Sequence, residues 1–358
     1  MSRTATLSDR IPPLPPKGSL ESKGPVEVSR AQLEAFKSTV VGELPALLEM
    51  DEVERQIDEV LDRRHPRFAG MVEQVRHFRG KRFRPLLVIL ASKAAGRTTE
   101  RHATLGAVME LIHTATLVHD DVLDGAQMRR HSPTVNARHD NYNSILLGDW
   151  IFSQAFALAS NLENLTINKM LAESACKVCE GELHQGLERG NLELDEAAYF
   201  RIIDGKTAEL LAACCKSSAI LAESPPALVQ HLETFGRKVG LAFQVADDLL
   251  DLVGEEGRTG KSLGTDLIQG KLTLPIIHAL RQPSSQRVLA LLNDAPADAN
   301  LARQAMVPLL QESGSIDYAK DIARRLVAEA RAALGHLPNT PWRQHLAHLA
   351  EKAISRSA

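Results

Sequence analysis

The sequence has 358 residues, of which 44% are apolar and only 4% aromatic, and its formal net charge is −3 at pH 7. This length allows one large domain or two small ones, and the near-neutral charge does not favour nucleic acid as a partner. No apolar run is long enough to span a membrane, and we expect no secretory signal. Frequent Ala and Leu residues favour helix over sheet.

The four cysteines do not form a recognisable metal or redox site. Cys176 and Cys179 form a C-x-x-C pair with His184 nearby, whereas Cys214 and Cys215 are adjacent. A zinc site would need a second ligand pair at suitable spacing, and a redox motif would need a β-α-β context. Neither is visible in the sequence, so small thiols within apolar helices are the favoured interpretation. We therefore expect a reducing compartment and a cytoplasmic location.

Residues 1–29 differ in composition from the rest of the sequence. They contain the proline-rich run IPPLPP at residues 11–16, followed by Lys, Gly and Ser. A segment of this composition cannot bury enough apolar surface to order itself. We therefore predict a disordered N-terminal tail over residues 1–29.

Helical spacing of apolar residues begins near residue 30 and continues to about residue 355. Val53, Ile57, Val60 and Leu61, for example, recur at the i, i+4, i+7 and i+8 positions of one helix face. Gly and Pro residues interrupt this pattern, and no convincing run of alternating strand residues is visible. We therefore predict one all-α domain over residues 30–358.

A basic segment precedes the apolar helix that we predict from Leu86 to Ala95. Lys81, Arg82 and Arg84 come just before Pro85, which suits the first turn of a helix. Cations at a helix N-terminus add to the effect of the free N–H groups and the helix dipole. The segment is therefore a candidate anion site, although by itself a solvated basic turn would be the favoured explanation.

Three carboxylates end an apolar, helix-competent run at residues 111–124. Asp120 and Asp124 would lie one turn apart on one helix face, with Asp121 beside them. Nothing basic interrupts the cluster, so its charges repel one another and need an external cation. Mg²⁺ usually takes one or two carboxylates and completes its shell with water and substrate phosphate. A metal–diphosphate site is one interpretation, and a solvated acidic helix face is the other.

The same pattern occurs again around Asp247, Asp248 and Asp251, where an apolar run ends in Asp-Asp, two apolar residues and Asp. Carboxylates placed among apolar neighbours are costly unless they are paired or bound to metal. The repetition therefore favours the metal interpretation, in which two clusters hold several cations around one polyanion.

Several cations follow the acidic clusters along the chain. They are Arg129, Arg130, Lys206, Lys261 and Lys271. Guanidinium groups bind phosphate oxygens bidentately, although arginines so close to carboxylates could simply pair with them. Metal ligands and cations together are what a bound diphosphate would need.

The order of these motifs along the sequence resembles that of the trans-isoprenyl diphosphate synthases, and the resemblance spans roughly residues 40–330. The motifs that carry it are Gly80–Pro85, His113, Asp120–Asp124, Arg129-Arg130, Gly181-Glu182-Leu183 with Gln185, Lys206-Thr207, Phe243-Gln244, Asp247–Asp251, Gly260-Lys261 and Lys271. The resemblance implies an all-α bundle around a deep central cavity, usually a homodimer. It also implies that the two acidic motifs face each other across the cavity mouth.

The resemblance further implies a role for individual residues. Three Mg²⁺ ions would be held by Asp120, Asp124, Asp247 and Asp251, with Asp121 in support. Isopentenyl diphosphate would be held by Lys81, Arg84, His113 and Arg130. The allylic diphosphate would be held by Arg129, Lys206 and Lys271 with Lys261 nearby, and its reacting end would meet Thr207 and Gln244.

The expected reaction joins isopentenyl diphosphate head-to-tail (1′–4) to an allylic diphosphate. Metal ions and cations stabilise the departing diphosphate, so that the allylic C–O bond ionises. The double bond of isopentenyl diphosphate then attacks the allyl cation, and a proton passes to the released diphosphate. Water has to be excluded, and the Gly-rich segment 254–264 is a candidate lid. The candidate catalytic residues are Asp120, Asp121, Asp124, Lys206, Thr207, Gln244 and Asp247.

One residue departs from the family pattern. His131 stands where a glycine usually follows the two arginines. A side chain at this position changes the local turn, and we expect it to affect how Arg130 is aimed more than the overall activity.

The helix before Asp120 carries an indication of product length. Thr116 lies about one turn below Asp120 with Ala115 beside it, and Ile112 and Met109 come next, the last about 16 Å below Asp120 at 1.5 Å per residue. In the family, bulky aromatics at the first two positions stop the chain early, and small residues leave the shaft open. We therefore expect a long-chain product of the quinone side-chain type, unless these residues merely pack against a neighbouring helix.

Three alternatives remain at this point. Geranylgeranyl diphosphate synthesis is the closest, followed by a class I terpene cyclase and a non-catalytic subunit of a heteromeric synthase. A cyclase binds one diphosphate and would not need Lys81 and Arg84, and two intact acidic clusters argue against a non-catalytic subunit. For the synthase we expect isopentenyl and allylic diphosphates as partners, and a long product that partitions into membrane.

Overall fold

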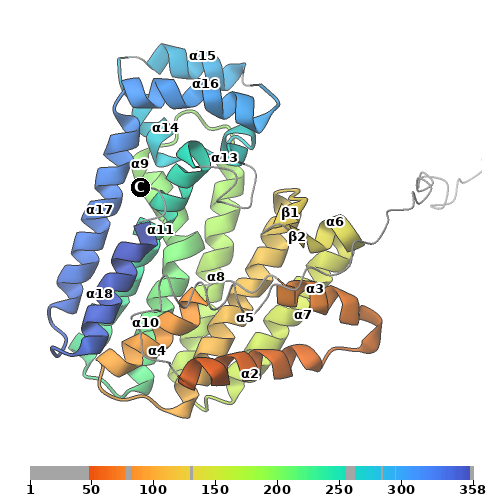
Figure 1. The fold of residues 1–358 in the computed structure, drawn as a ribbon, viewed down its shortest axis with the longest axis vertical. Helices are drawn as coiled ribbons and strands as arrows, with labels where there is room; N and C mark the ends of the chain where they lie inside the picture. The colour runs from red at the N-terminus through yellow and green to blue at the C-terminus, as the bar shows by residue number, and fades with distance from the viewer. Residues whose placement is uncertain are drawn as a thin grey trace, which may run out of the picture.

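The computed structural model describes residues 48–77, 82–129, 132–254, 263–283, 285–294 and 296–354. Within these ranges the chain is almost entirely helical, so the predicted all-α class is confirmed (Figure 1). The expected tail at residues 1–29 lies outside the described residues, as do the candidate residues Lys81, Arg130, His131 and Lys261.

Helix α5 (Glu100–Leu123), which carries the first acidic motif, is the centre of the N-terminal half of the bundle. It packs against α2 (Leu48–Asp62), α4 (Phe83–Ala94) and α7 (Asn141–Ser160). A side chain at Gly106 would meet Val53 at 3.1 Å and Pro85 at 3.3 Å, so the missing Cβ lets α2 and α4 approach α5 closely. Residues on more than one side of α5 are buried, because helices cover it from several directions.

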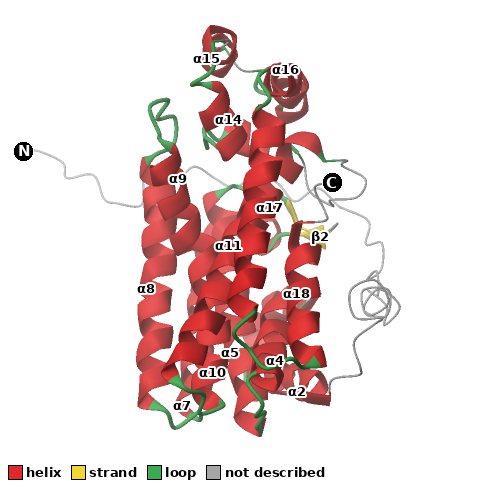
Figure 2. Cartoon of the chain, turned by 90° about the vertical axis from the view of Figure 1, so that its left-hand side faces the viewer, coloured by secondary structure: helices red, strands yellow, loops and turns green. Residues whose placement is uncertain are grey.

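Helix α11 (Pro226–Val253), which carries the second acidic motif, organises the other half. It packs against α10 (Glu209–Leu221), α17 (Ser315–Leu334) and α18 (Pro341–Ile354). Phe235 is fully buried in this half of the core. Figure 2 shows α8 (Leu165–Leu187), α11, α17 and α18 as roughly parallel rods.

A π-helical segment, η3 (Asp204–Ala208), interrupts the helical run between α9 (Glu196–Ile203) and α10. It lies between two glycines of neighbouring helices. A Cβ on Gly181 of α8 would lie 2.4 Å from the backbone nitrogen of Lys206, and one on Gly240 of α11 would lie 2.5 Å from Cα of Ala208. The two glycines therefore allow backbones to pack directly on the π-helical turn, and π-helical turns occur frequently at functional sites.

The remaining elements are short or lie at the ends of the bundle. They are η2 (Pro66–Phe68), α3 (Ala69–His77), the antiparallel strand pair β1 (Met128–Arg129) and β2 (Ser132–Pro133), α6 (Val135–His139), α13 (Thr265–Ile268), α14 (Leu274–Ala279), α15 (Ser285–Asn293) and α16 (Ala299–Glu312). Among the described helices, none combines the length and apolarity that a membrane crossing requires.

Helix α4 begins at Phe83, three residues before the start that we predicted from the apolar pattern. Pro85 therefore lies within the first turn rather than at its first position, where the missing N–H still has no intrahelical partner to lose. Arg82 is the N-cap residue and adopts the left-handed conformation, with φ of 50°. The basic segment thus continues into the first turn of the helix.

Candidate active site

The first acidic motif lies at the C-terminal end of α5. Asp120 and Asp121 are in its last turn, and Asp124 is the C-cap residue. Carboxylates at this end of a helix meet the negative end of the helix dipole, so each of them is stabilised by a nearby cation. Figure 1 shows that the C-terminal ends of α5, α8 and α11 lie at the same end of the bundle.

Asp120 is half-buried at the end of α5. Its side chain keeps partial solvent access, yet burial raises its pKa to about 6, and Glu182 and Asp124 add to the rise while Lys206 opposes it. A carboxyl group that is both accessible and desolvated is typical of the base of a cleft. Such a carboxylate gains from binding a cation.

Asp121 is buried and already paired. Nε of Arg129 donates to its two carboxylate oxygens at 2.8 and 3.1 Å, and Nη2 lies 2.8 Å from Oδ1. Burial raises the pKa of Asp121, while Arg129 acts in the opposite direction. Arg129, which we expected at the allylic diphosphate, is therefore fixed by Asp121 at the edge of the motif.

The second acidic motif lies in the last two turns of α11. Asp251 is buried and accepts hydrogen bonds from Thr265 Oγ1 at 3.1 Å and from the backbone N–H of Asp266 at 3.2 Å. Asp247 precedes it by one turn and lies near enough to Asp248 to raise its pKa by repulsion. The second motif is thus bonded to the first two residues of α13.

Lys271 joins the two acidic motifs. Its ammonium group lies 2.9 Å from Oδ1 of Asp124 and 3.9 Å from Oδ1 of Asp266, and Asp266 contacts Asp251 through its backbone. Gln269 also donates from Nε2 to the backbone carbonyl of Asp124 at 3.3 Å. Two clusters that are remote in sequence are therefore brought to one site through residues 265–271.

Lys206 projects from the π-helical segment toward the first acidic motif. Its Nζ lies 2.5 Å from Glu182 Oε2 and donates to Gln185 Oε1 at 2.9 Å, both on α8. Burial alone would lower the pKa of Lys206, but Asp120 and Glu182 outweigh it and the pKa is raised. The ammonium group therefore stays charged beside Asp120, as a diphosphate site requires.

Thr207, Gln244, Asp248 and Tyr199 form a chain of hydrogen bonds beside Lys206. Thr207 Oγ1 donates to Gln244 Oε1 at 2.7 Å, and Gln244 Nε2 donates to Asp248 Oδ1 at 2.7 Å. Tyr199 donates from its hydroxyl to Asp248 Oδ2 at 2.6 Å. Burial raises the pKa of Asp248 to about 8, with repulsion from Asp266 adding to it and the bonds from Tyr199 and Gln244 opposing it.

The basic segment at the start of α4 contributes Arg84. Its Nε is buried and has no hydrogen-bond partner among the described residues. Burial lowers the pKa of Arg84, although Glu110 of α5 acts in the opposite direction. His113 lies on the same helix as Glu110 and is half-buried. An unpartnered guanidinium nitrogen at a helix N-terminus suits an anionic ligand.

The residues expected to set product length lie along α5 below Asp120. Met109, Ile112 and Ala115 are buried, and Thr116 is half-buried with its hydroxyl donating to the carbonyl of His113 at 2.8 Å. Their order along α5 is the one that the expectation requires, and their effect on product length stays a prediction.

The donor set fits Mg²⁺ better than a metal held by protein alone. Among the described residues, no three His, Cys, Asp or Glu side chains are grouped closely enough to hold a metal ion. Mg²⁺ usually takes only one or two carboxylates and completes its octahedron with water and substrate phosphates. Carboxylates on two helices, with Asp120 desolvated, fit that mode of binding.

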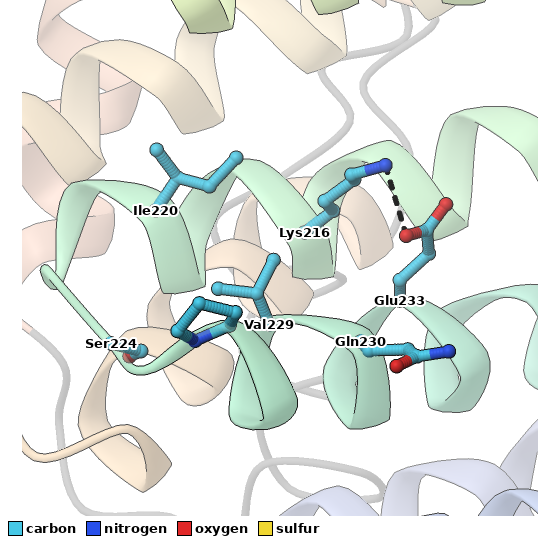
Figure 3. Close-up of a pocket in the computed structure, with 7 residues that line it drawn as sticks. Lys216, Ile220, Ser224, Val229, Gln230 and Glu233 are labelled. Carbon is cyan, nitrogen blue, oxygen red and sulfur yellow. Dashed lines mark ion pairs between the residues drawn. The ribbon is translucent and has the colours of Figure 1, made fainter.

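A surface hollow lies between the end of α10 and the start of α11, far along α11 from Asp247. Its rim includes Ser224, Val229 and an ion pair of 2.9 Å between Lys216 and Glu233 (Figure 3). It is a shallow surface depression without the charged groups of the acidic site.

Sequence reasoning gave no role to Tyr199, Arg189 or Glu110. Arg189 lies 3.3 Å from Asp124 Oδ1 and shares this carboxylate with Lys271. Tyr199 precedes Lys206 by seven residues, a spacing that places two residues near one helix face, so periodicity could have drawn attention to it. No local pattern distinguishes Glu110 or Arg189.

Comparison with known proteins identifies the family. The family model for polyprenyl synthetase matches residues 65–308. The octaprenyl diphosphate synthase of Escherichia coli (strain K12) is 38% identical over 280 residues, which cover 77% of this chain and 86% of that protein. The all-trans-nonaprenyl-diphosphate synthase (geranyl-diphosphate specific) of Rhodobacter capsulatus is 36% identical over 278 residues, or 77% of this chain and 85% of that protein.

Solved structures agree with this result. The polyprenyl synthase of Caulobacter crescentus CB15, complexed with calcium and isoprenyl diphosphate, superposes with a TM-score of 0.79 at 34% identity, covering 91% of this chain and 98% of that one. The predicted resemblance and the predicted enzyme class are confirmed. Because the family model matches more than half of its length and relatives above 30% identity cover more than two thirds of it, the chain belongs to the polyprenyl synthetase family.

Proposed function

We propose that the enzyme condenses isopentenyl diphosphate head-to-tail with an allylic diphosphate and releases a long-chain trans-polyprenyl diphosphate. The observation that carries the proposal is the link from Asp124 through Lys271 and Asp266 to Asp251, which brings both acidic motifs to one site. The relatives named as octaprenyl and nonaprenyl diphosphate synthases support the long-chain assignment.

Mg²⁺ would be held by Asp120 and Asp124 on one side and by Asp247 and Asp251 on the other, and when bound it would neutralise the diphosphate that leaves. We propose three ions, because a diphosphate between two acidic clusters offers oxygens to each. In the structure Lys271 forms an ion pair with Asp124. When Asp124 binds a Mg²⁺ ion, Lys271 would instead contact a phosphate oxygen. Asp121 would keep Arg129 in place during this exchange.

The chain's own residues would orient and protect the reacting carbons. Lys206 lies beside Asp120 and would hold a phosphate oxygen of the allylic substrate. Thr207 and Gln244, locked by their mutual hydrogen bond, would present oxygen dipoles to the developing allyl cation. Arg84 and His113, with Lys81 and Arg130, would hold isopentenyl diphosphate, and Lys261 would join the allylic site. The proton lost after coupling would pass to the released diphosphate.

The reaction can be tested directly with purified protein. Labelled isopentenyl diphosphate, Mg²⁺ and primers of several lengths should give long polyprenyl diphosphates, identified by chromatography after dephosphorylation. Release of diphosphate from the allylic substrate alone would instead indicate a terpene cyclase. Absence of any product from the purified protein would favour the non-catalytic subunit, and products that stop at geranylgeranyl length would favour the short-chain alternative.

Small residues on α5 support a long product. Ala115 and Thr116 are small, so in our proposal they would leave room below Asp120 that an aromatic side chain would fill, and Met109 lies about 16 Å lower at 1.5 Å per residue. The substrates are water-soluble and the product is apolar. We propose that the enzyme works in the cytoplasm and delivers its product to a membrane.

An exposed apolar surface supports a homodimer. Among the described residues, large exposed side chains gather on α7 and α8: Tyr142, Ile145, Leu146, Leu165, Leu183 and Leu187. Exposed apolar side chains are typical of interfaces between subunits, and we propose a second copy of the chain as the partner.

Sedimentation velocity tests the homodimer. The wild-type protein should sediment as a dimer, and Leu183→Glu should shift it towards monomer because a charge would be buried in the interface. Leu301→Glu, at a leucine of similar exposure on α16, is the matched control and should leave the dimer intact. A wild-type monomer would contradict the proposal.

A further inference from the structure

Two arginines at the start of α4 interact with one buried carboxylate, that of Glu110. Arg82 donates from Nη1 to Glu110 Oε1 at 3.0 Å, and from Nε and Nη2 to the two oxygens of Glu54 at 2.5 and 3.0 Å. Arg84 is also close enough to Glu110 for the carboxylate to raise its pKa against the effect of burial. Glu110 therefore has two candidate partners and is paired with one of them.

The conformation of Arg82 shows what this pairing costs. Its backbone is left-handed, with φ of 50° and ψ of 39°, which costs a non-glycine residue about 1 kcal/mol or more. Its side chain does not cap the helix that it precedes. The two carboxylates of Glu54 and Glu110 hold the guanidinium in place, and Glu110 and Arg82 are both buried. Strain of this kind persists where the surrounding contacts require one geometry.

Arg84 is left with spare hydrogen-bonding capacity. Its Nε is buried and finds no acceptor among the described residues. A buried guanidinium nitrogen without an acceptor is costly, and that cost disappears when an anion binds. The first turn of α4, with its free N–H groups, adds to the attraction for an anion at this place.

We propose that Arg82 is a positioning residue. It pairs with Glu110 and so leaves Arg84 available to bind the diphosphate group of isopentenyl diphosphate. The inference rests on the proposed role of Arg84 in the synthase reaction. Without Arg82, Glu110 would be a buried charge without its partner, and Arg84 is a second cation of the described chain that already interacts with it. The guanidinium of Arg84 would then form an ion pair with Glu110 and would no longer be available to bind the substrate.

The proposal is tested by steady-state kinetics on a double-mutant cycle. Arg82→Met should raise the KM for isopentenyl diphosphate about tenfold, with kcat and the KM for the allylic primer within about twofold of wild type. Adding Glu110→Gln to this variant should restore the KM, because the competing carboxylate is gone. A purely structural role for Arg82 predicts no such rescue, since the second substitution removes one more native contact.

Glu110→Gln alone gives an independent answer, because it keeps the shape of the side chain even if Arg82→Met folds poorly. The proposal expects an unchanged or lower KM for isopentenyl diphosphate. A raised KM in this variant would overturn it, because Glu110 would then be what orients Arg84. An unrescued KM in a folded double variant would overturn it as well.

Two further variants separate this inference from the proposed function. Arg84→Met should raise the KM for isopentenyl diphosphate at least as much as Arg82→Met does; if it does not, the role of Arg84 itself fails. Arg55→Met is the matched control for the substitution, since Arg55 also pairs with two glutamates, Glu52 and Glu59, but on the exposed face of α2. Its kinetics should equal those of the wild type.

Discussion

The hydroxyl of Thr207 donates a hydrogen bond of 2.7 Å to the side-chain oxygen of Gln244. This bond joins the π-helical segment η3, which follows α9, to α11 at a point about one turn before the second acidic motif. Asp248 and Tyr199 continue the chain, so that the orientation of the Gln244 amide is fixed from both ends. Gln244, which we propose at the reacting end of the allylic site, is therefore held in place partly by Tyr199, a residue that lies outside every motif.

Removing the hydroxyl of Tyr199 should disturb this chain. Tyr199→Phe leaves the carboxyl group of Asp248 without one of its two donors and lets the Gln244 amide turn. We expect kcat to fall about tenfold, and the free energy of unfolding to fall by about 1–2 kcal/mol because a buried acceptor loses its partner. Initial rates and urea unfolding measure the two effects.

Tyr318→Phe is the matched control, because the hydroxyl of Tyr318 also donates to a carboxylate, Glu196, which belongs to neither acidic motif. Its kcat should stay at the wild-type value. Equal kcat in the two variants would contradict a specific role for Tyr199.

The close packing of Gly181 on the π-helical turn makes another prediction. In Gly181→Ala the new Cβ would lie 2.4 Å from the backbone nitrogen of Lys206, so either the turn or α8 must shift. We expect a loss of about 1–3 kcal/mol in the free energy of unfolding, together with a lower kcat because Lys206 moves.

Gly186→Ala provides the control on the same helix, where no atom lies within 4 Å of the added Cβ. It should be neutral or slightly stabilising, because alanine favours helix. If both variants kept wild-type stability and kcat, close packing at Gly181 would not constrain the turn.

Product length should respond to the size of residue 116. Thr116→Phe places a ring about one helical turn below Asp120 and should shorten the product, measured by chromatography of the dephosphorylated polyprenols. Thr114→Phe is the control, since Thr114 is also half-buried on α5 but points in a different direction from the helix axis. An unchanged product distribution in Thr116→Phe would refute the role of this position.

The raised pKa of Asp120 predicts how stability depends on pH. Burial raises this pKa from 3.8 to about 6, so the folded protein keeps a proton between these pH values that the unfolded chain has lost. The free energy of unfolding of the metal-free protein should therefore fall by about 1–3 kcal/mol as pH rises from about 4 to about 6. Asp120→Asn cannot titrate and should lack this part of the decline.

Urea unfolding in the presence of EDTA at several pH values measures the difference between the wild type and Asp120→Asn. Parallel pH profiles for the two proteins would contradict the prediction. Added Mg²⁺ should flatten the wild-type profile, because the cation replaces the proton.

The helical class and both acidic motifs could be predicted from the sequence because they depend on local spacing. Asp120 and Asp124 share a helix face whatever surrounds them. Arg129 was expected at the substrate, although its position soon after the motif also allowed the pairing with Asp121 that the structure shows. Local patterns are thus reliable for which residues cluster and weaker for which residue each one contacts.

Contacts between distant segments could not be predicted in this way. Arg82 meets Glu54 and Glu110, each 28 residues away in sequence, and nothing in either flank indicates the pairing. Tyr199 likewise reaches Asp248 only because η3 and α11 are packed together through Gly240. Such contacts depend on how helices cross, which one-dimensional periodicity does not encode.

Both acidic motifs end long helices, where the dipole adds its own negative charge to that of the carboxylates. In the structure Arg129, Lys271 and Arg189 offset part of this charge, and the Mg²⁺ ions that we propose would offset more of it. Binding of Mg²⁺ at the proposed site would link ligation to folding thermodynamically, so that free magnesium would raise the resistance to unfolding as well as the turnover. A cell short of the ion would lose not only flux through the enzyme but also some of the enzyme itself.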